Sequence, residues 1–92
     1  MDKELVFITV IGKDRKGIVA KFSTYLYRSG INIEDISQRI MDKYFVMVML
    51  VDTHSANRTL DRIGRDLARI GKSMNLAVQI QHENIFKMMH RI

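Results

Sequence analysis

The sequence contains no cysteine and no proline, and three histidines that are scattered along the chain. Without cysteine, no disulfide can hold the fold together and no thiolate can serve as a nucleophile or metal ligand, which suits a cytoplasmic protein. His54, His82 and His90 lack the spacing of a metal site, and no serine completes a nucleophile set with them. No apolar run approaches the length of a membrane span. The sequence therefore predicts no catalytic residues, no metal site, no cofactor and no membrane segment.

The chain is rich in apolar residues. Its 92 residues predict one domain, 1–92, and 47% of them are hydrophobic. A chain of this length is marginally stable alone, so we interpret the apolar excess as surface to be buried against a partner. The net charge of +5 permits acidic partners or nucleic acid without requiring them.

Hydrophobic periodicity divides the chain into six elements. We expect strands over 5–11, 31–41, 44–51 and 74–81, and helices over 17–29 and 55–71. Asp14 is the expected N-cap of the first helix and Gly30 its C-terminal cap. In the second strand the apolar residues change phase between Ile33 and Ile36, which predicts a β-bulge near Asp35.

The order β-α-β-β-α-β predicts an α+β, ferredoxin-like fold, a four-stranded antiparallel sheet with two helices on one face. Its core would span residues 5–81, followed by a short helical tail over 82–92 with Ile85, Met88, Met89 and Ile92 at helical spacing. The first and third strands are apolar on both faces, as central strands should be. The face without helices would then expose large apolar side chains, which we expect to include Phe7, Phe45, Met47 and Met49. A second copy of the protein or the tail should cover them.

The loop Gly12-Lys13-Asp14-Arg15-Lys16-Gly17 separates the first strand from the first helix. Free backbone N–H groups at the start of a helix form a natural binding point for a carboxylate or another small anion. Gly17 would either admit a ligand close to the backbone or only allow close packing between loop and helix. The loop predicts a binding site rather than an enzyme.

Two segments give the chain a resemblance to the ACT domain family. One is Asp14-Arg15-Lys16-Gly17-Ile18, where the family typically has Asp/Asn-Arg-Pro-Gly and an aliphatic residue. The other is Gly30-Ile31-Asn32-Ile33-Glu34 at the start of the second strand. The resemblance extends from about Leu5 to Gln81 and is closest to the small stand-alone ACT proteins. Lys16 stands in place of the usual proline.

The resemblance implies a regulatory or sensor module that pairs with itself and binds an amino acid or related metabolite near the interface between copies. The candidate ligand-binding residues are Asp14, Arg15, Gly17, Ile18, Ile31 and Asn32. The carboxylate of Asp14 could accept an α-ammonium group, whereas it would repel an α-carboxylate.

Two alternatives belong to other functional classes. The second predicted helix has a stripe of five cations, with no acid in the stripe itself and with Asp61 and Asp66 on its flanks. The stripe is either a solvated face or a surface that binds the phosphates of a nucleic acid. Its members are Arg58, Arg62, Arg65, Arg69 and Lys72. An acylphosphatase-like enzyme on the same fold would need a glycine-rich phosphate cradle closely followed by a catalytic arginine. After Arg15 the first helix offers only Lys21 before Arg28, so the sequence does not favour that enzyme.

Overall fold

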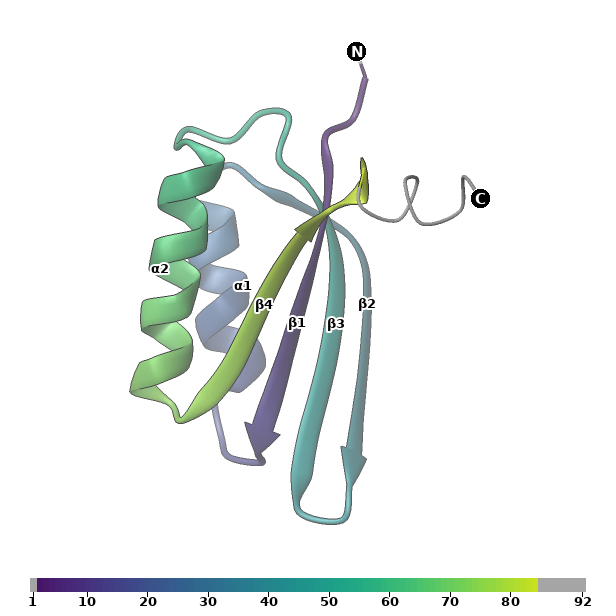
Figure 1. The fold of residues 1–92 in the computed structure, drawn as a ribbon, viewed down its shortest axis with the longest axis vertical. Coiled ribbons are helices and arrows are strands. Elements are labelled where there is room, and N and C mark those ends of the chain that lie inside the picture. Colours follow the sequence, from purple (N-terminus) through teal and green to yellow (C-terminus); the bar gives the residue numbers. More distant parts are fainter. Residues whose placement is uncertain (1, 85–92) are drawn as a thin grey trace.

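Four strands and two helices follow one another in the predicted order β-α-β-β-α-β (Figure 1). The computed structural model describes residues 2–84. The elements are β1, Leu5–Lys13; α1, Ile18–Arg28; β2, Asn32–Met41; β3, Tyr44–Asp52; α2, Leu60–Ser73; and β4, Leu76–His82. The strands form one antiparallel sheet in the spatial order β2-β3-β1-β4, with both helices on one side. The predicted ferredoxin-like fold, with β1 and β3 central, is confirmed, while residues 85–92 of the predicted tail lie outside the described residues.

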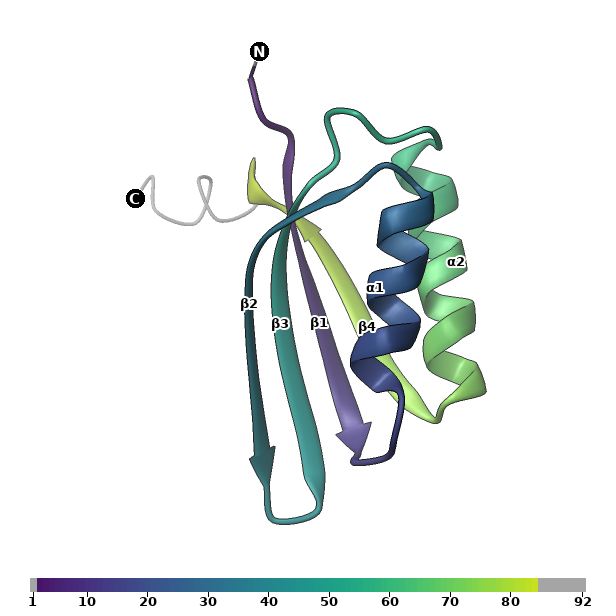
Figure 2. The same ribbon diagram turned by 180° about the vertical axis from the view of Figure 1, so that it is seen from behind.

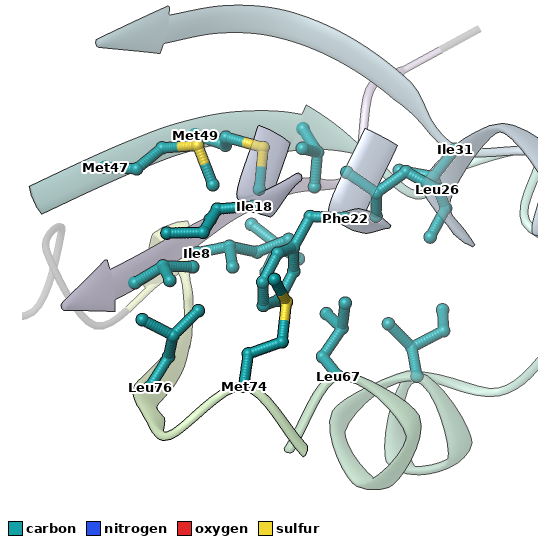
Figure 3. Packing of buried hydrophobic residues seen from close by; sticks show 14 of the residues in the cluster. Ile8, Ile18, Phe22, Leu26, Ile31, Met47, Met49, Leu67, Met74 and Leu76 are labelled. Atoms are coloured by element: carbon teal, nitrogen blue, oxygen red, sulfur yellow. The ribbon is translucent and has the colours of Figure 1, made fainter. Parts of the chain in front are cut away.

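Helix α1 packs through residues four apart along one face. Ile18, Phe22 and Leu26 are buried, and the ring of Phe22 lies between the sheet and α2 (Figure 3). The helix ends in a Schellman motif, in which the N–H of Gly30 donates to the carbonyl of Tyr27 and the N–H of Ile31 to that of Leu26. Gly30 has a φ of +71°, which confirms it as the C-terminal capping glycine.

The bulge predicted in the second strand is present. The pairing of β2 with β3 shifts register between Ile33 and Asp35. Because of that shift, Ile33 and Ile36 both stand opposite β3 residues that face the helices, Val51 and Met49.

The core lies between the sheet and the two helices. Its strand residues are Val6, Ile8 and Val10 of β1, Phe45, Met47, Met49 and Val51 of β3, and Leu76 of β4. Ile63 and Leu67 of α2 belong to the same cluster, and Leu67 closes the core from the helix side (Figure 3). The expectation that Phe45, Met47 and Met49 lie on the uncovered face is therefore wrong, because all three are buried beneath the helices.

The uncovered face carries the alternate residues of the same two strands. Ile11, Tyr44 and Val48 are 45%, 49% and 37% exposed, and Phe7 and Leu50 on this face are half-buried. Phe7 is thus the one residue of the four that was placed correctly. An apolar open face does exist, built from a different set of side chains.

The helices leave part of β2 uncovered as well. Helix α2 lies over β4, and the turn between β2 and β3 extends past the helix layer (Figure 2). Ile36 and Ile40 stand on the helix side of β2, yet they are 38% and 61% exposed. The edge strand β2 therefore has apolar side chains that α1 and α2, the helices of the described residues, do not bury.

Candidate functional site

The loop between β1 and α1 presents the start of the helix to solvent. Gly17 is the N-cap residue, with a φ of +87°, and no side chain caps the helix. The prediction of Asp14 as the N-cap is wrong, because Asp14 lies three positions before the N-cap residue Gly17. The carbonyl of Gly17 accepts the N–H of Lys21, whereas the first N–H groups of the helix have no intrahelical acceptor. The first turn also contains no acidic residue, so its positive dipole end is open to an anion.

Gly17 stands in open space. A Cβ built at this position would meet nothing within 4 Å. Close packing between loop and helix therefore does not explain the glycine. Its positive φ does, because only glycine adopts this conformation at little cost.

Charged side chains surround this helix start. Asp14, Arg15 and Lys16 are all exposed, so each is free to turn toward a ligand at the first turn of α1. The backbone N–H of Asp14 donates to the carbonyl of Lys43 at 2.9 Å. That bond ties the loop to the turn between β2 and β3, next to the end of β2 at Met41.

Ile18 and Ile31 belong to the core. They are 2% and 6% exposed, so their side chains pack against neighbouring apolar residues. At these two candidate positions the backbone, rather than the side chain, is what remains for a ligand.

Strand β2 starts at the opposite end of α1 from the loop (Figure 2), and Asn32 is its first residue. The eleven residues of α1 span about 16 Å, so one chain does not bring Asn32 together with Asp14 and Gly17. The exposed amide of Asn32 donates to Glu34, which also pairs with Lys3. The hydrogen bond from Lys3 is the main reason why the pKa of Glu34 lies below its ordinary value.

The basic stripe on the second helix differs from the expectation. Helix α2 begins at Leu60, after the N-cap Thr59, so Arg58 precedes it. Asp66 lies among the arginines and is only 6% exposed. Arg62 Nε approaches its Oδ2 at 3.2 Å and Arg69 its Oδ1 at 3.4 Å, while Arg65 pairs with Asp61. The stripe is therefore not free of acids, which weakens the nucleic-acid hypothesis.

Asp66 also joins the two helices. The hydroxyl of Tyr25 on α1 donates to its Oδ2 at 2.7 Å. This hydrogen bond is the largest cause of a pKa below the ordinary aspartate value, and Arg62 and Arg69 lower it further. The sequence analysis missed this cluster, although an aspartate four residues after one arginine and three before another is a recognisable pairing pattern.

Residues 2–84 contain no group of three or more His, Cys, Asp and Glu side chains able to hold a metal ion. Within the same range, no helix has the length and apolar character needed to cross a membrane.

Comparison with known proteins places these features in a family. The ACT domain family model matches residues 4–81. A UPF0237 protein of Methanocaldococcus jannaschii is 47% identical over 87 residues, which cover 95% of this chain and 97% of that protein.

Solved structures agree with the fold. An ACT domain protein from Streptococcus pneumoniae superposes with a TM-score of 0.80 at 34% identity, over 92% of this chain and 96% of that one. A formyltetrahydrofolate deformylase from Pseudomonas syringae has a TM-score of 0.82 at 20% identity, a likeness of fold that covers 90% of this chain and 28% of the enzyme. ACT domains are regulatory modules that bind small molecules. The chain belongs to the ACT domain family.

Proposed function

We propose that this protein is a non-enzymatic, cytoplasmic sensor that binds an amino acid or a related metabolite at a site shared by two copies. The observation that carries the proposal is the start of α1. No side chain caps it, its first turn contains no acidic residue, and its N-cap Gly17, at φ +87°, stands in open space. An α-carboxylate fits the free N–H groups there, and Arg15 adds a nearby positive charge. The exposed carboxylate of Asp14 suits the α-ammonium group.

Two features of the sheet favour self-association. The open face exposes Ile11, Tyr44 and Val48, and β2 is an edge strand with Ile36 and Ile40 uncovered on its helix side. An unpaired edge with apolar flanking side chains is suited to pairing with another strand. A second copy can supply that strand without any other protein.

Antiparallel pairing of two β2 edges also completes the ligand site. β2 begins at Asn32 and ends at Met41, and the loop is bonded to Lys43 just beyond that end. In an antiparallel pair, the start of one strand lies opposite the end of the other. Asn32 of one copy would then approach the loop of the other, where its amide can both donate to and accept from the ligand.

Regulation follows from this arrangement. A ligand that contacts both copies binds the paired form better than the separated one, and only such a difference in affinity can shift the equilibrium between them. The fraction of paired copies would then follow the concentration of the ligand. Through this pairing, the module would alter the state of a partner protein.

A thermal-shift screen of the amino acids and common metabolites tests the proposal. A ligand present at a hundredfold excess over its Kd stabilises the native state by about 2.7 kcal/mol. With a hit in hand, Asn32→Ala should weaken binding by at least one hydrogen bond, roughly 0.5–1.5 kcal/mol. Ser37→Ala, a matched truncation of another exposed β2 residue, should leave affinity unchanged.

The screen can also contradict the proposal. If no amino acid or metabolite shifts the melting temperature, the site does not bind this class of ligand. If Asn32→Ala and Ser37→Ala weaken binding equally, Asn32 is not a ligand contact.

A further inference from the structure

A groove of about 470 Å³ lies between α1 and α2; its lining includes Gly17 at the start of α1 but not Asn32. Its cationic side chains are Lys21 and Arg28 of α1 and Arg58 before α2, and Thr24 adds a hydroxyl. Ala20 and Ile70 give it an apolar wall, and no acidic residue lines it. The volume falls within the range of small-molecule sites.

Arg58 is held in place on three sides. Its guanidinium lies 5.2 Å from the centre of the Tyr25 ring, donates to the buried hydroxyl of Ser29 at 3.1 Å, and approaches Asp66 Oδ2 at 3.7 Å. Its side chain nevertheless keeps 33% of its surface exposed. The position of this cation is therefore fixed before any ligand arrives, which lowers the entropy cost of binding.

The positive charge around the groove is not balanced. Arg58, Arg62 and Arg69 share the single carboxylate of Asp66. Within the described part of the chain, Lys21 and Arg28 pair with no carboxylate. Three cations and no acidic residue line the groove, so its lining carries a formal charge of +3.

A phosphate group matches this set of side chains. Guanidinium groups donate two parallel N–H bonds to phosphate oxygens, an ammonium group adds a point charge, and a hydroxyl can donate to the same oxygens. A phosphate dianion also neutralises more of this positive charge than a single carboxylate does. The apolar wall of Ala20 and Ile70 suits an organic group attached to the phosphate.

We propose that the α1–α2 groove binds a phosphorylated small molecule, with its phosphate among Lys21, Arg28 and Arg58 and its organic part against Ala20 and Ile70. The groove is bounded along its length by α1, which has only eleven residues, and Arg65 of α2 pairs with Asp61 instead of extending the basic surface. A small molecule therefore suits it better than a nucleic-acid strand.

Phenyl phosphate is the probe, because it combines a phosphate with an apolar ring. We expect saturable binding by calorimetry at physiological ionic strength, weaker binding of inorganic phosphate, and none of phenol. Amide NMR shifts should gather at residues 20–28 and near Arg58. Failure to saturate, or equal binding of phenol, would overturn the proposal.

Three glutamine variants test the contacts. Lys21→Gln and Arg28→Gln remove exposed cations that have no carboxylate partner in the described chain, and each should lower the affinity about tenfold. Arg65→Gln changes the same charge on α2 outside the groove and should alter the affinity less than about twofold. Equal losses in all three variants would mean general electrostatic attraction and would contradict a built site.

Two further measurements distinguish binding in this groove from binding at the proposed amino-acid site and from binding of a nucleic acid. Asp14→Ala and Asn32→Ala change residues of the proposed amino-acid site that do not line the groove, so both should leave the affinity for phenyl phosphate unchanged, and the groove can be tested separately from that site. A short single-stranded RNA should bind more weakly than phenyl phosphate. If it binds more tightly and loses affinity in Lys21→Gln and Arg28→Gln, the groove serves a nucleic acid and the small-molecule proposal is wrong.

Discussion

Replacement of Gly17 by alanine should affect stability much less than the same change at Gly30. Both glycines have positive φ, +87° and +71°, so both variants place a Cβ in the left-handed region. They differ in the space around that atom. At Gly17 it meets nothing within 4 Å, whereas at Gly30 it would stand 2.9 Å from the backbone carbonyl oxygen of Ser55.

The magnitudes follow from these two facts. The left-handed conformation costs a non-glycine residue about 1–2 kcal/mol. Reduced freedom of the unfolded chain offsets roughly 0.4–1 kcal/mol of that cost. Gly17→Ala should therefore destabilise the protein by about 1 kcal/mol. Gly30→Ala should add the cost of forcing backbone atoms apart, about 1–3 kcal/mol more.

Urea unfolding at fixed protein concentration gives the free energy of unfolding of both variants. In thermal unfolding, each kcal/mol lost should lower the melting temperature by roughly 4–8 °C for a domain of this size. A Gly17→Ala variant that is as unstable as Gly30→Ala would refute the claim that the helix start is open. With the fold retained, Gly17→Ala then becomes a clean test of ligand contact at the loop.

Two other predictions concern pH and association. The pKa values of Asp66 and Asp52 lie below the ordinary aspartate value, mainly because Tyr25 donates to Asp66 and the backbone N–H of Glu4 donates to Asp52. The unfolded chain therefore binds more protons in acid, so the stabilisation is complete above about pH 4 and is lost as the pH falls through the folded-state values. Tyr25→Phe should flatten the acid limb of unfolding free energy against pH, and an unchanged limb would contradict the role of this hydrogen bond. Sedimentation equilibrium at micromolar concentration should show at least two copies, and Ile36→Lys should shift them toward monomer. If Val48→Lys separates the copies and Ile36→Lys does not, the open face forms the interface and β2 does not.

The fold could be predicted because two independent patterns agreed. Element order alone gives a ferredoxin-like topology, and the doubly apolar strands were the two that this topology places in the centre. The bulge was visible because Ile33 and Ile36 could share a face only if one residue were inserted between them.

Two features could not be predicted without the tertiary structure: which face of a strand meets the helices, and where the second helix begins. Every residue of 45–51 is apolar, so the sequence could not tell which alternate set faces the helices. Only the burial of Met47 and Met49 in one cluster with residues of both helices decides it. The second helix was expected to begin at 55 and begins at Leu60. Asn57 is instead bonded to the end of α1, through its N–H to the carbonyl of Ser29 and through its side chain to that of Arg28.

The candidate site was only partly readable for the same reason. The sequence marks the glycine and the charges of the loop, and its predicted helix over 17–29 already separates them from Asn32. The sequence does not show that Tyr25 and Asp66, far apart along the chain, meet between the helices.

Mixing two inactive variants tests the shared site most directly. Asp14→Ala alters the loop and Asn32→Ala the strand, and each should lose affinity for the amino acid found in the screen. In a mixed dimer, the intact loop of the Asn32→Ala copy meets the intact Asn32 of the Asp14→Ala copy. Calorimetry after exchange of copies should therefore recover a fraction of sites with the original affinity. No recovery, although the copies exchange, would contradict a site built from two copies.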